Sequence, residues 1–128
     1  RIAAQLGLKG VNQTRKVDVL NGEEKSLQTM AVQFEVCSLH NKRKVNMNAL
    51  TADRVTGDMH VIDWKDESKK WAHLINVPFE GVVRKPVDLL IGIDHSDLHM
   101  SLKEVRGRSC EPVARLTPLG WTCIGAVR

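Results

Sequence analysis

The stretch Val87-Asp88-Leu89-Leu90-Ile91-Gly92-Ile93-Asp94 carries the strongest indication of the fold. Its centre is a short apolar run that ends at a glycine and is followed by an acidic residue. A run of this length predicts a central strand that buries side chains on both faces. Gly92 has no Cβ, so it allows a turn or the close approach of another backbone. We expect this strand to lie in the core and Asp94 or Ser96 to cap one short helix carrying Leu98.

Alternating sequence upstream of that run predicts a β-hairpin and a third strand. Polar and apolar residues alternate over 16–19 and again over 30–36. Asn21-Gly22 between them is typical of a tight turn, because both residues tolerate a positive φ. After a turn at residues 41–44, the alternation resumes over 45–49, with Val45, Met47 and Ala49 expected to point inward.

The remaining segments predict short helices and one more strand. We expect a helix over residues 1–8, with Gly7 or Gly10 at its C-terminal cap. A second helix should begin near Asp63 or Asp66, carry Trp64, Trp71, Leu74 and Ile75 on one face, and end before Pro78. We expect residues 103–111 to form a solvated link and residues 119–125 to form a final strand. The predicted fold is mostly β: a small closed or highly curved sheet with two or three short helices.

Composition limits the classes of protein that this chain can belong to. It has 128 residues, of which 42% are hydrophobic, so it can form one domain with a core. The net charge of +4 is a mild excess of base that a solvated surface explains better than a nucleic-acid interface. An odd set of three cysteines argues against a disulfide scaffold and favours an intracellular, cytoplasmic setting.

The sequence shows no targeting or membrane signal. No apolar run approaches the ~20 residues that a membrane helix needs, and no signal peptide is visible. The chain opens on Arg1 rather than on methionine, and its first helix lacks an N-terminal capping sequence. We therefore expect it to be a segment of a longer protein.

Five segments, taken in order, resemble the retropepsin-like protease domain of Pao/BEL-type LTR retrotransposon polyproteins. They are Ala4-Gln5-Leu6-Gly7-Leu8, Val19-Leu20-Asn21-Gly22, Trp71-Ala72-His73-Leu74, the run Asp88–Asp94, and Pro112–Thr122 with its Thr-x-Leu-Gly-Trp ending. Each segment alone is common in proteins. The Leu-Gly-Trp tail that follows an Ile-Gly-x-Asp strand at this distance is the more specific part of the resemblance.

The resemblance implies a retropepsin-like closed or curved β-barrel over residues 1–102, followed by a linker and a closing strand over 103–128. It also implies an aspartic endopeptidase that processes a polyprotein, works as a homodimer and needs no cofactor or metal. In such a fold Leu20, Asn21 and Gly22 would form the tip of a flap over an extended peptide substrate. Leu90, Ile91 and Gly92 would support the catalytic loop from below, and Asp94 would have a structural role.

The catalytic tripeptide of that family is missing here. The chemistry needs two carboxylates that share a proton and activate a water, each from an Asp-Thr-Gly or Asp-Ser-Gly segment. None of the aspartates in this chain is followed by Thr-Gly or Ser-Gly. No residue is therefore assigned as catalytic, and the chain is expected to be inactive as it stands. The alternative is a catalytically dead dimerisation or peptide-binding domain.

Other residue patterns point to sites only weakly. Cys37 and His40 have a spacing found in zinc sites, but a second close pair is missing, because Cys110 and Cys123 lie far apart in sequence. His95 and His99 are four residues apart, without the glutamate of a metalloprotease helix. A basic nucleic-acid-binding module remains a third, disfavoured hypothesis, since aromatic residues that would stack on bases are not interleaved with the basic ones.

Overall fold

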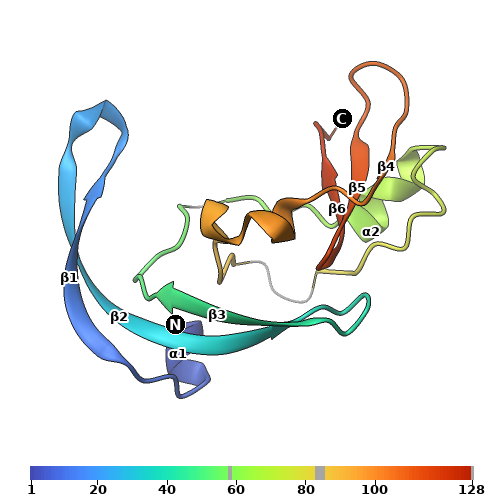
Figure 1. The fold of residues 1–128 in the computed structure, drawn as a ribbon. Helices are drawn as coiled ribbons and strands as arrows, with labels where there is room; N and C mark the ends of the chain where they lie inside the picture. Colours follow the sequence, from blue (N-terminus) through green and yellow to red (C-terminus); the bar gives the residue numbers. More distant parts are fainter. Residues whose placement is uncertain (58, 83–85, 128) are drawn as a thin grey trace. The chain divides into compact units, whose positions relative to one another are not determined.

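The computed structural model describes residues 1–57, 59–82 and 86–127. Strands dominate over short helices, which confirms the prediction of a mostly β fold. Within the described residues the strands form two three-stranded sheets, ordered β1-β2-β3 and β4-β5-β6, and these do not join into a closed barrel (Figure 1).

The chain divides into two compact units. The first comprises residues 1–36 and 45–57; the second comprises residues 37–44 and the described residues after Gly57. The first unit holds helix α1 (Ile2–Gln5), strand β1 (Val11–Asp18), the 3-10 turn η1 (Leu20–Gly22) and most of strands β2 (Glu24–Cys37) and β3 (Lys44–Leu50). The second holds α2 (Trp64–Glu67), η2 (Ser68–Lys70), η3 (Ile93–His99), β4 (Lys103–Val105), β5 (Val113–Thr117) and β6 (Gly120–Ile124).

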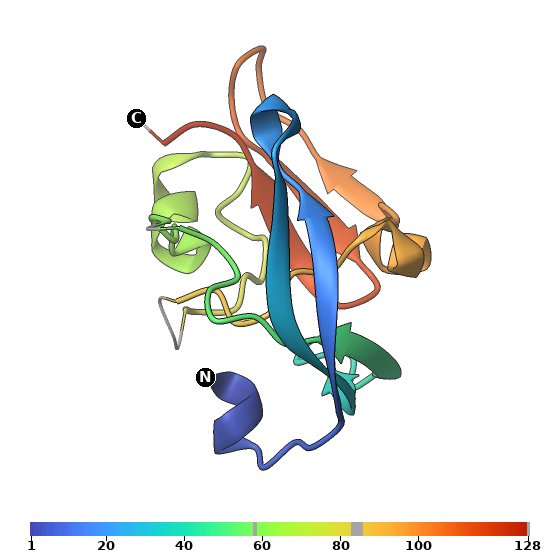
Figure 2. The same cartoon turned by 90° about the vertical axis from the view of Figure 1, so that its left-hand side faces the viewer.

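The predicted hairpin of the first unit is confirmed. Strands β1 and β2 pair antiparallel from Val11↔Ala31 to Asp18↔Glu24, and they form the long ribbon seen in Figure 2. Asn21 and Gly22 have φ values of 78° and 73°, the left-handed conformation expected of an Asn-Gly turn. The predicted alternation also holds in β2 and β3, where Val32 and Met47 are buried.

The first helix is confirmed in shortened form. Helix α1 ends in two backbone bonds: Gly7 N donates to Ala4 O and Leu8 N donates to Ala3 O. Gly7 has a φ of 67°, so this pair of bonds forms a glycine-terminated C-cap. The predicted Gly7 cap is correct.

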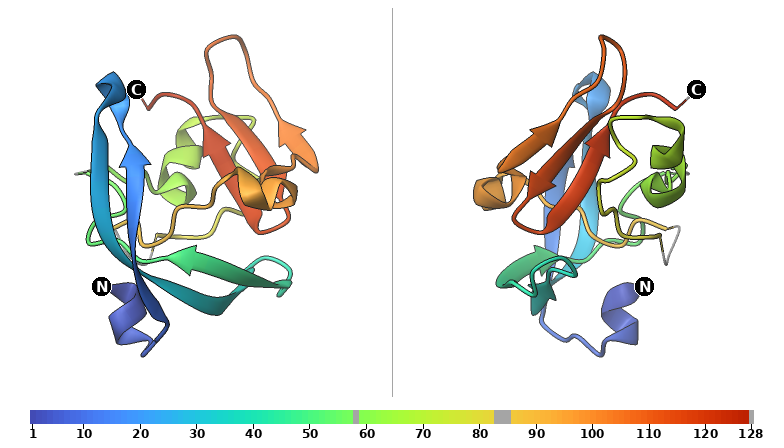
Figure 3. Two further views of the ribbon diagram at one scale, coloured as in Figure 1. Left: turned by 60° about the vertical axis from the view of Figure 1, so that its left-hand side comes forward. Right: turned by 90° about the vertical axis from the view of Figure 1, so that its right-hand side faces the viewer.

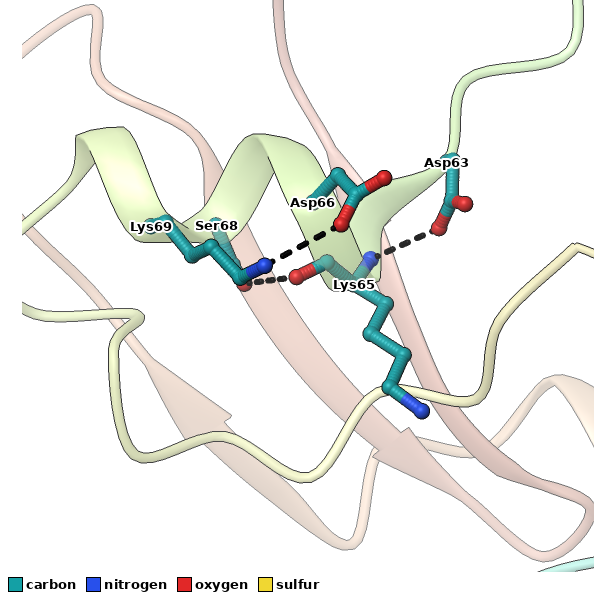
Figure 4. Close-up of polar contacts among 5 residues, drawn as sticks. All are labelled: Asp63, Lys65, Asp66, Ser68 and Lys69. Carbon is teal, nitrogen blue, oxygen red and sulfur yellow. Dashed lines mark hydrogen bonds and ion pairs between the residues drawn. The ribbon is translucent and has the colours of Figure 1, made fainter.

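The second helix begins as predicted but ends early. Asp63 Oδ1 accepts a hydrogen bond from Lys65 N at 3.1 Å, and Ser68 Oγ donates to Lys65 O at 3.2 Å (Figure 4). The pair Lys69–Asp66 lies on the exposed side at 3.2 Å. The helical residues stop at Lys70, so the prediction of one helix reaching Ile75 is wrong.

The early stop of this helix allows the core of the second unit to form. Trp71 is extended, with φ −124° and ψ 117°, and the turns that follow bury Leu74 completely. Leu74, Phe79 and Ala114 form the buried cluster, and the partly buried side chains packed against it are Trp64, Trp71, Val77, Val105, Trp121 and Cys123. Both Trp64 and Trp71 thus pack against the core. Tertiary packing has overridden local helix propensity here.

The prediction of a buried central strand at residues 87–92 is wrong. No residue between Val87 and Gly92 is assigned to a strand, and Leu90 and Ile93 are 72% and 92% exposed. The physical reason is that a strand needs a partner backbone, and no described strand pairs with this run. The short helix beyond it exists as η3 and buries Leu98, but no side chain caps its start.

The sequence missed two strands of the second sheet. β4 lies inside the segment that was expected to be a solvated link, and β5 lies between Pro112 and Pro118. β5 pairs with β4 on one side and with β6 on the other, as Figure 3 shows. The predicted final strand is confirmed as β6, the edge of this sheet.

Candidate functional site

The predicted flap tip is an exposed turn. Leu20 is 91% exposed, and a Cβ added at Gly22 would meet no atom within 4 Å. Val19 N donates to Glu23 O at 2.8 Å and closes the turn. Leu20, Asn21 and Gly22 are therefore exposed residues of η1, the turn at the end of the β1–β2 ribbon (Figures 1 and 2).

The predicted support residues surround the start of η3. Ile91 is half-buried, whereas Leu90, Gly92 and Asp94 are exposed. His99 Nε2 lies 3.1 Å from the Gly92 carbonyl oxygen, so this ring nitrogen donates and connects the two ends of η3. This segment and the hairpin tip fall in different compact units.

Arg115 connects η3 to the second sheet. Arg115 on β5 donates from Nη2 to His99 O at 2.8 Å. Arg43 Nη2 and Asp97 Oδ2 form an exposed ion pair at 4.0 Å. The first contact holds the C-terminal end of η3, while the second adds little, because exposed pairs are weak.

The structure shows a polar junction that sequence reasoning missed, formed by His73, Glu111 and the Pro112 carbonyl. His73 Nε2 lies 2.7 Å from Pro112 O, and since a carbonyl only accepts, this nitrogen carries a proton. His73 Nδ1 is 3.7 Å from Glu111 Oε2, which also accepts from Arg108 N at 2.7 Å. Gly107 makes room for this junction, as a Cβ there would lie 2.5 Å from His73 Cε1.

A second polar centre fixes the turn between β2 and β3 within the second unit. Ser38 is 3% exposed; its Oγ donates to Leu119 O at 2.8 Å and accepts from His40 N at 3.1 Å. Asn41 Nδ2 donates to Pro118 O at 3.3 Å. These bonds satisfy buried backbone groups at the β5–β6 turn, so both centres are structural.

The three cysteines are free thiols in two environments. Burial raises the pKa of the Cys123 thiol to about 11, partly offset by a backbone hydrogen bond at Ile124. Cys37 and Cys110 are exposed. Cys110 has a positive φ of 67° in the loop after β4.

We therefore expect selective alkylation of the native protein at pH 8. A pKa of about 11 instead of 9.0 lowers the Cys123 thiolate fraction by about 100-fold, and the thiolate is the nucleophile. Iodoacetamide should modify Cys37 and Cys110 first, and Cys123 should react at comparable speed only after denaturation. Mass spectrometry of peptides from a time course measures the three rates; rapid native labelling of Cys123 would contradict its burial.

In the described residues, no three His, Cys, Asp or Glu side chains gather closely enough to bind a metal ion. No described helix is long and apolar enough to span a bilayer. Comparisons with protein-family models, with curated proteins and with solved structures find no match for this chain.

Proposed function

We propose that this chain is part of a retropepsin-like aspartic peptidase domain of a Pao/BEL-type retrotransposon polyprotein, and that it does not hydrolyse peptides by itself. The catalytic aspartate would come from an Asp-Thr-Gly or Asp-Ser-Gly segment outside this sequence. Two such carboxylates, one from each subunit of a homodimer, would share a proton and activate water.

One observation carries the proposal: the run from Val87 to Asp94 has the composition of a central strand, but among the described residues it forms no strand and joins neither sheet. Leu90 and Ile93 are 72% and 92% exposed, although Leu and Ile are among the residues most often buried. A catalytic-loop segment packed on this run would cover both side chains and explain why these positions are apolar. With that segment in place, Leu90, Ile91 and Gly92 would support the catalytic loop from below, as the resemblance implies.

The hairpin tip supports the same proposal. Leu20, Asn21 and Gly22 form an exposed turn at the end of a two-stranded ribbon, the position that a substrate flap requires. An extended polyprotein segment would bind there through backbone hydrogen bonds, as an added strand does. In that role the freedom of the Asn21-Gly22 turn matters more than its side chains.

The test is peptidase activity in a chain extended upstream. The chain is produced with the residues encoded directly before Arg1, and both forms are incubated with peptide libraries between acidic and neutral pH. We expect cleavage by the extended form only, with inhibition by pepstatin-like compounds. Its control is Asp→Asn in the upstream tripeptide, which should abolish cleavage without unfolding the chain. A folded, extended chain with an intact aspartate and no activity would contradict the proposal.

A second candidate function is a catalytically dead dimerisation or peptide-binding domain. It is favoured by β1, which lies at the edge of its sheet and, within the described part of the chain, has a strand on one side only. This candidate predicts saturable binding of extended peptides, or self-association, by the 128-residue chain alone. A strict monomer in sedimentation that binds no library peptide would remove it.

A further inference from the structure

The outer edge of β1 is a regular strand edge. β1 pairs with β2 over eight residues in continuous register, and its sequence contains no proline. In the described residues its other side has no strand neighbour. Natural edge strands avoid unwanted pairing through bulges, prolines, charged side chains or a covering element. β1 has neither a bulge nor a proline, so its charged residues determine which partner strand it can accept.

The register shows which backbone groups face outward. Val19 N donates to Glu23 O, so these two opposite residues form a hydrogen-bonded pair. Hydrogen-bonded pairs recur at every second position of an antiparallel ladder, so Val17↔Lys25 is the next one along β1. Met30 O accepts from Thr51 N, so Met30 faces away from β1, and its partner Asn12 is not bonded to β2. Asn12, Thr14, Lys16 and Asp18 therefore direct their N–H and C=O groups to the open edge.

Charges along this edge favour a particular partner. Asp18 lies directly opposite Glu24, an unfavourable like-charge pair. Lys16 Nζ is 3.5 Å from Glu24 Oε1, and both side chains are well exposed. The edge thus carries a cation at position 16 and an anion at position 18. When two copies of this edge run antiparallel, the cation of each copy can lie opposite the anion of the other.

We propose that β1 of one copy pairs antiparallel with β1 of a second copy, centred on Val17, to join two β1-β2-β3 sheets. In this register Lys16 of each copy faces Asp18 of the other, and the outward groups of both residues exchange backbone hydrogen bonds. Val17, which is 39% exposed in one copy, meets Val17 of the second copy on the opposite face. Each Asp18 gains a cation opposite it, which offsets its repulsion from Glu24.

This register excludes its neighbours by charge. A shift that centres the pairing on Lys16 places two lysines opposite each other, and a shift to Arg15 does the same with two arginines. Like charges directly opposite are unfavourable in antiparallel sheets. The pairing covers residues 15–19 of each copy, because η1 begins at Leu20, so the dimer is a weak one whose affinity falls with added salt.

The proposal stands apart from the peptidase proposal, and it specifies the contact that the dimerisation candidate would use. Its test is sedimentation equilibrium of the 128-residue chain at several concentrations and at low and high salt. We expect a concentration-dependent dimer. Lys16→Asp and Asp18→Lys, each alone, place like charges across the contact and should weaken dimerisation by about tenfold or more.

A mixture of the two variants is the decisive measurement. Asp at position 16 of one copy then faces Lys at position 18 of the other, and Lys16 faces Asp18, so the mixed dimer should regain the affinity of the original chain. Lys9→Asp and Asp53→Lys make the same charge changes at exposed residues off the strand and should leave dimerisation unchanged. Circular dichroism confirms that each variant is folded.

Three results would overturn the proposal. The first is a monomer at every concentration, and the second is an equal loss of affinity in the control variants. The third is failure of the mixture to restore dimerisation. The second and third results would mean that the dimer forms through another surface, such as the chain ends.

Discussion

Replacing Leu74 by alanine is expected to lower the free energy of unfolding by about 2–5 kcal/mol. Leu74 is fully buried, and with Phe79 and Ala114 it forms the cluster on which the second unit depends. Removing its branched side chain leaves a cavity that the surrounding tryptophans cannot fill without leaving their own positions. Urea unfolding followed by tryptophan fluorescence measures the change.

Ile75 provides a matched control for this substitution. It is adjacent in sequence and loses the same kind of side chain in Ile75→Ala, but it is 59% exposed. The free energy of unfolding should change by no more than about 0.5 kcal/mol, as for most surface substitutions. Equal effects at the two positions would mean that Leu74 does not occupy the core.

Replacing Gly107 by alanine is expected to destabilise the protein by about 1–3 kcal/mol. The new Cβ would collide with Glu111 Oε2 and lie 2.5 Å and 2.7 Å from two atoms of the His73 ring. To relieve the collision, either the hydrogen bond from His73 Nε2 to Pro112 O or the one from Arg108 N to Glu111 Oε2 has to break. The bond from His73 to Pro112 is partly buried, so breaking it is unfavourable, whereas the bond from Arg108 to Glu111 is exposed and contributes less.

Two further variants show whether this junction is the cause. Gly57→Ala is the control, because a Cβ at Gly57 meets no atom within 4 Å and its φ lies outside the left-handed region. Glu111→Ala removes one of the colliding side chains, so Gly107→Ala should cost less in that background than in the original chain. A double-mutant cycle measures this coupling. Strictly additive effects would contradict the placement of Glu111 beside Gly107.

The features that the sequence predicted correctly are those with local causes. The Asn21-Gly22 turn, the alternation of β2 and β3, the Gly7 cap and the Asp63 cap each depend on residues within a few positions of one another. Backbone preferences and hydrogen bonds at short range are sufficient for these features, whatever the rest of the chain does.

The features that the sequence missed depend on distant residues. His73 bonds Pro112 across 39 positions, and Ser38 bonds Leu119 across 81. The helix stops at Lys70 because Trp71 and Leu74 pack on β5 and β6, which lie far along the chain. β4 carries charged residues, so its pattern resembles a loop until β5 is placed beside it.

The predicted site shows the same division. Leu20, Asn21 and Gly22 lie where the local signal places them, at an exposed turn. The run through Leu90 and Ile91 has the composition of a strand, but composition alone does not supply the partner that a strand requires. His73 was noted only as part of the Trp71–Leu74 segment, and Gly107, a single glycine in a charged loop, does not by itself indicate the side chains that it accommodates.

The central claim is that the run Val87–Asp94, with its exposed Leu90 and Ile93, belongs to a peptidase domain whose catalytic segment lies upstream. It is tested most directly by reading the coding sequence before Arg1. The account predicts an in-frame Asp-Thr-Gly or Asp-Ser-Gly shortly before helix α1, preceded by apolar residues able to cover Leu90 and Ile93. An upstream sequence that encodes no such tripeptide, or a start codon directly before Arg1, would contradict it.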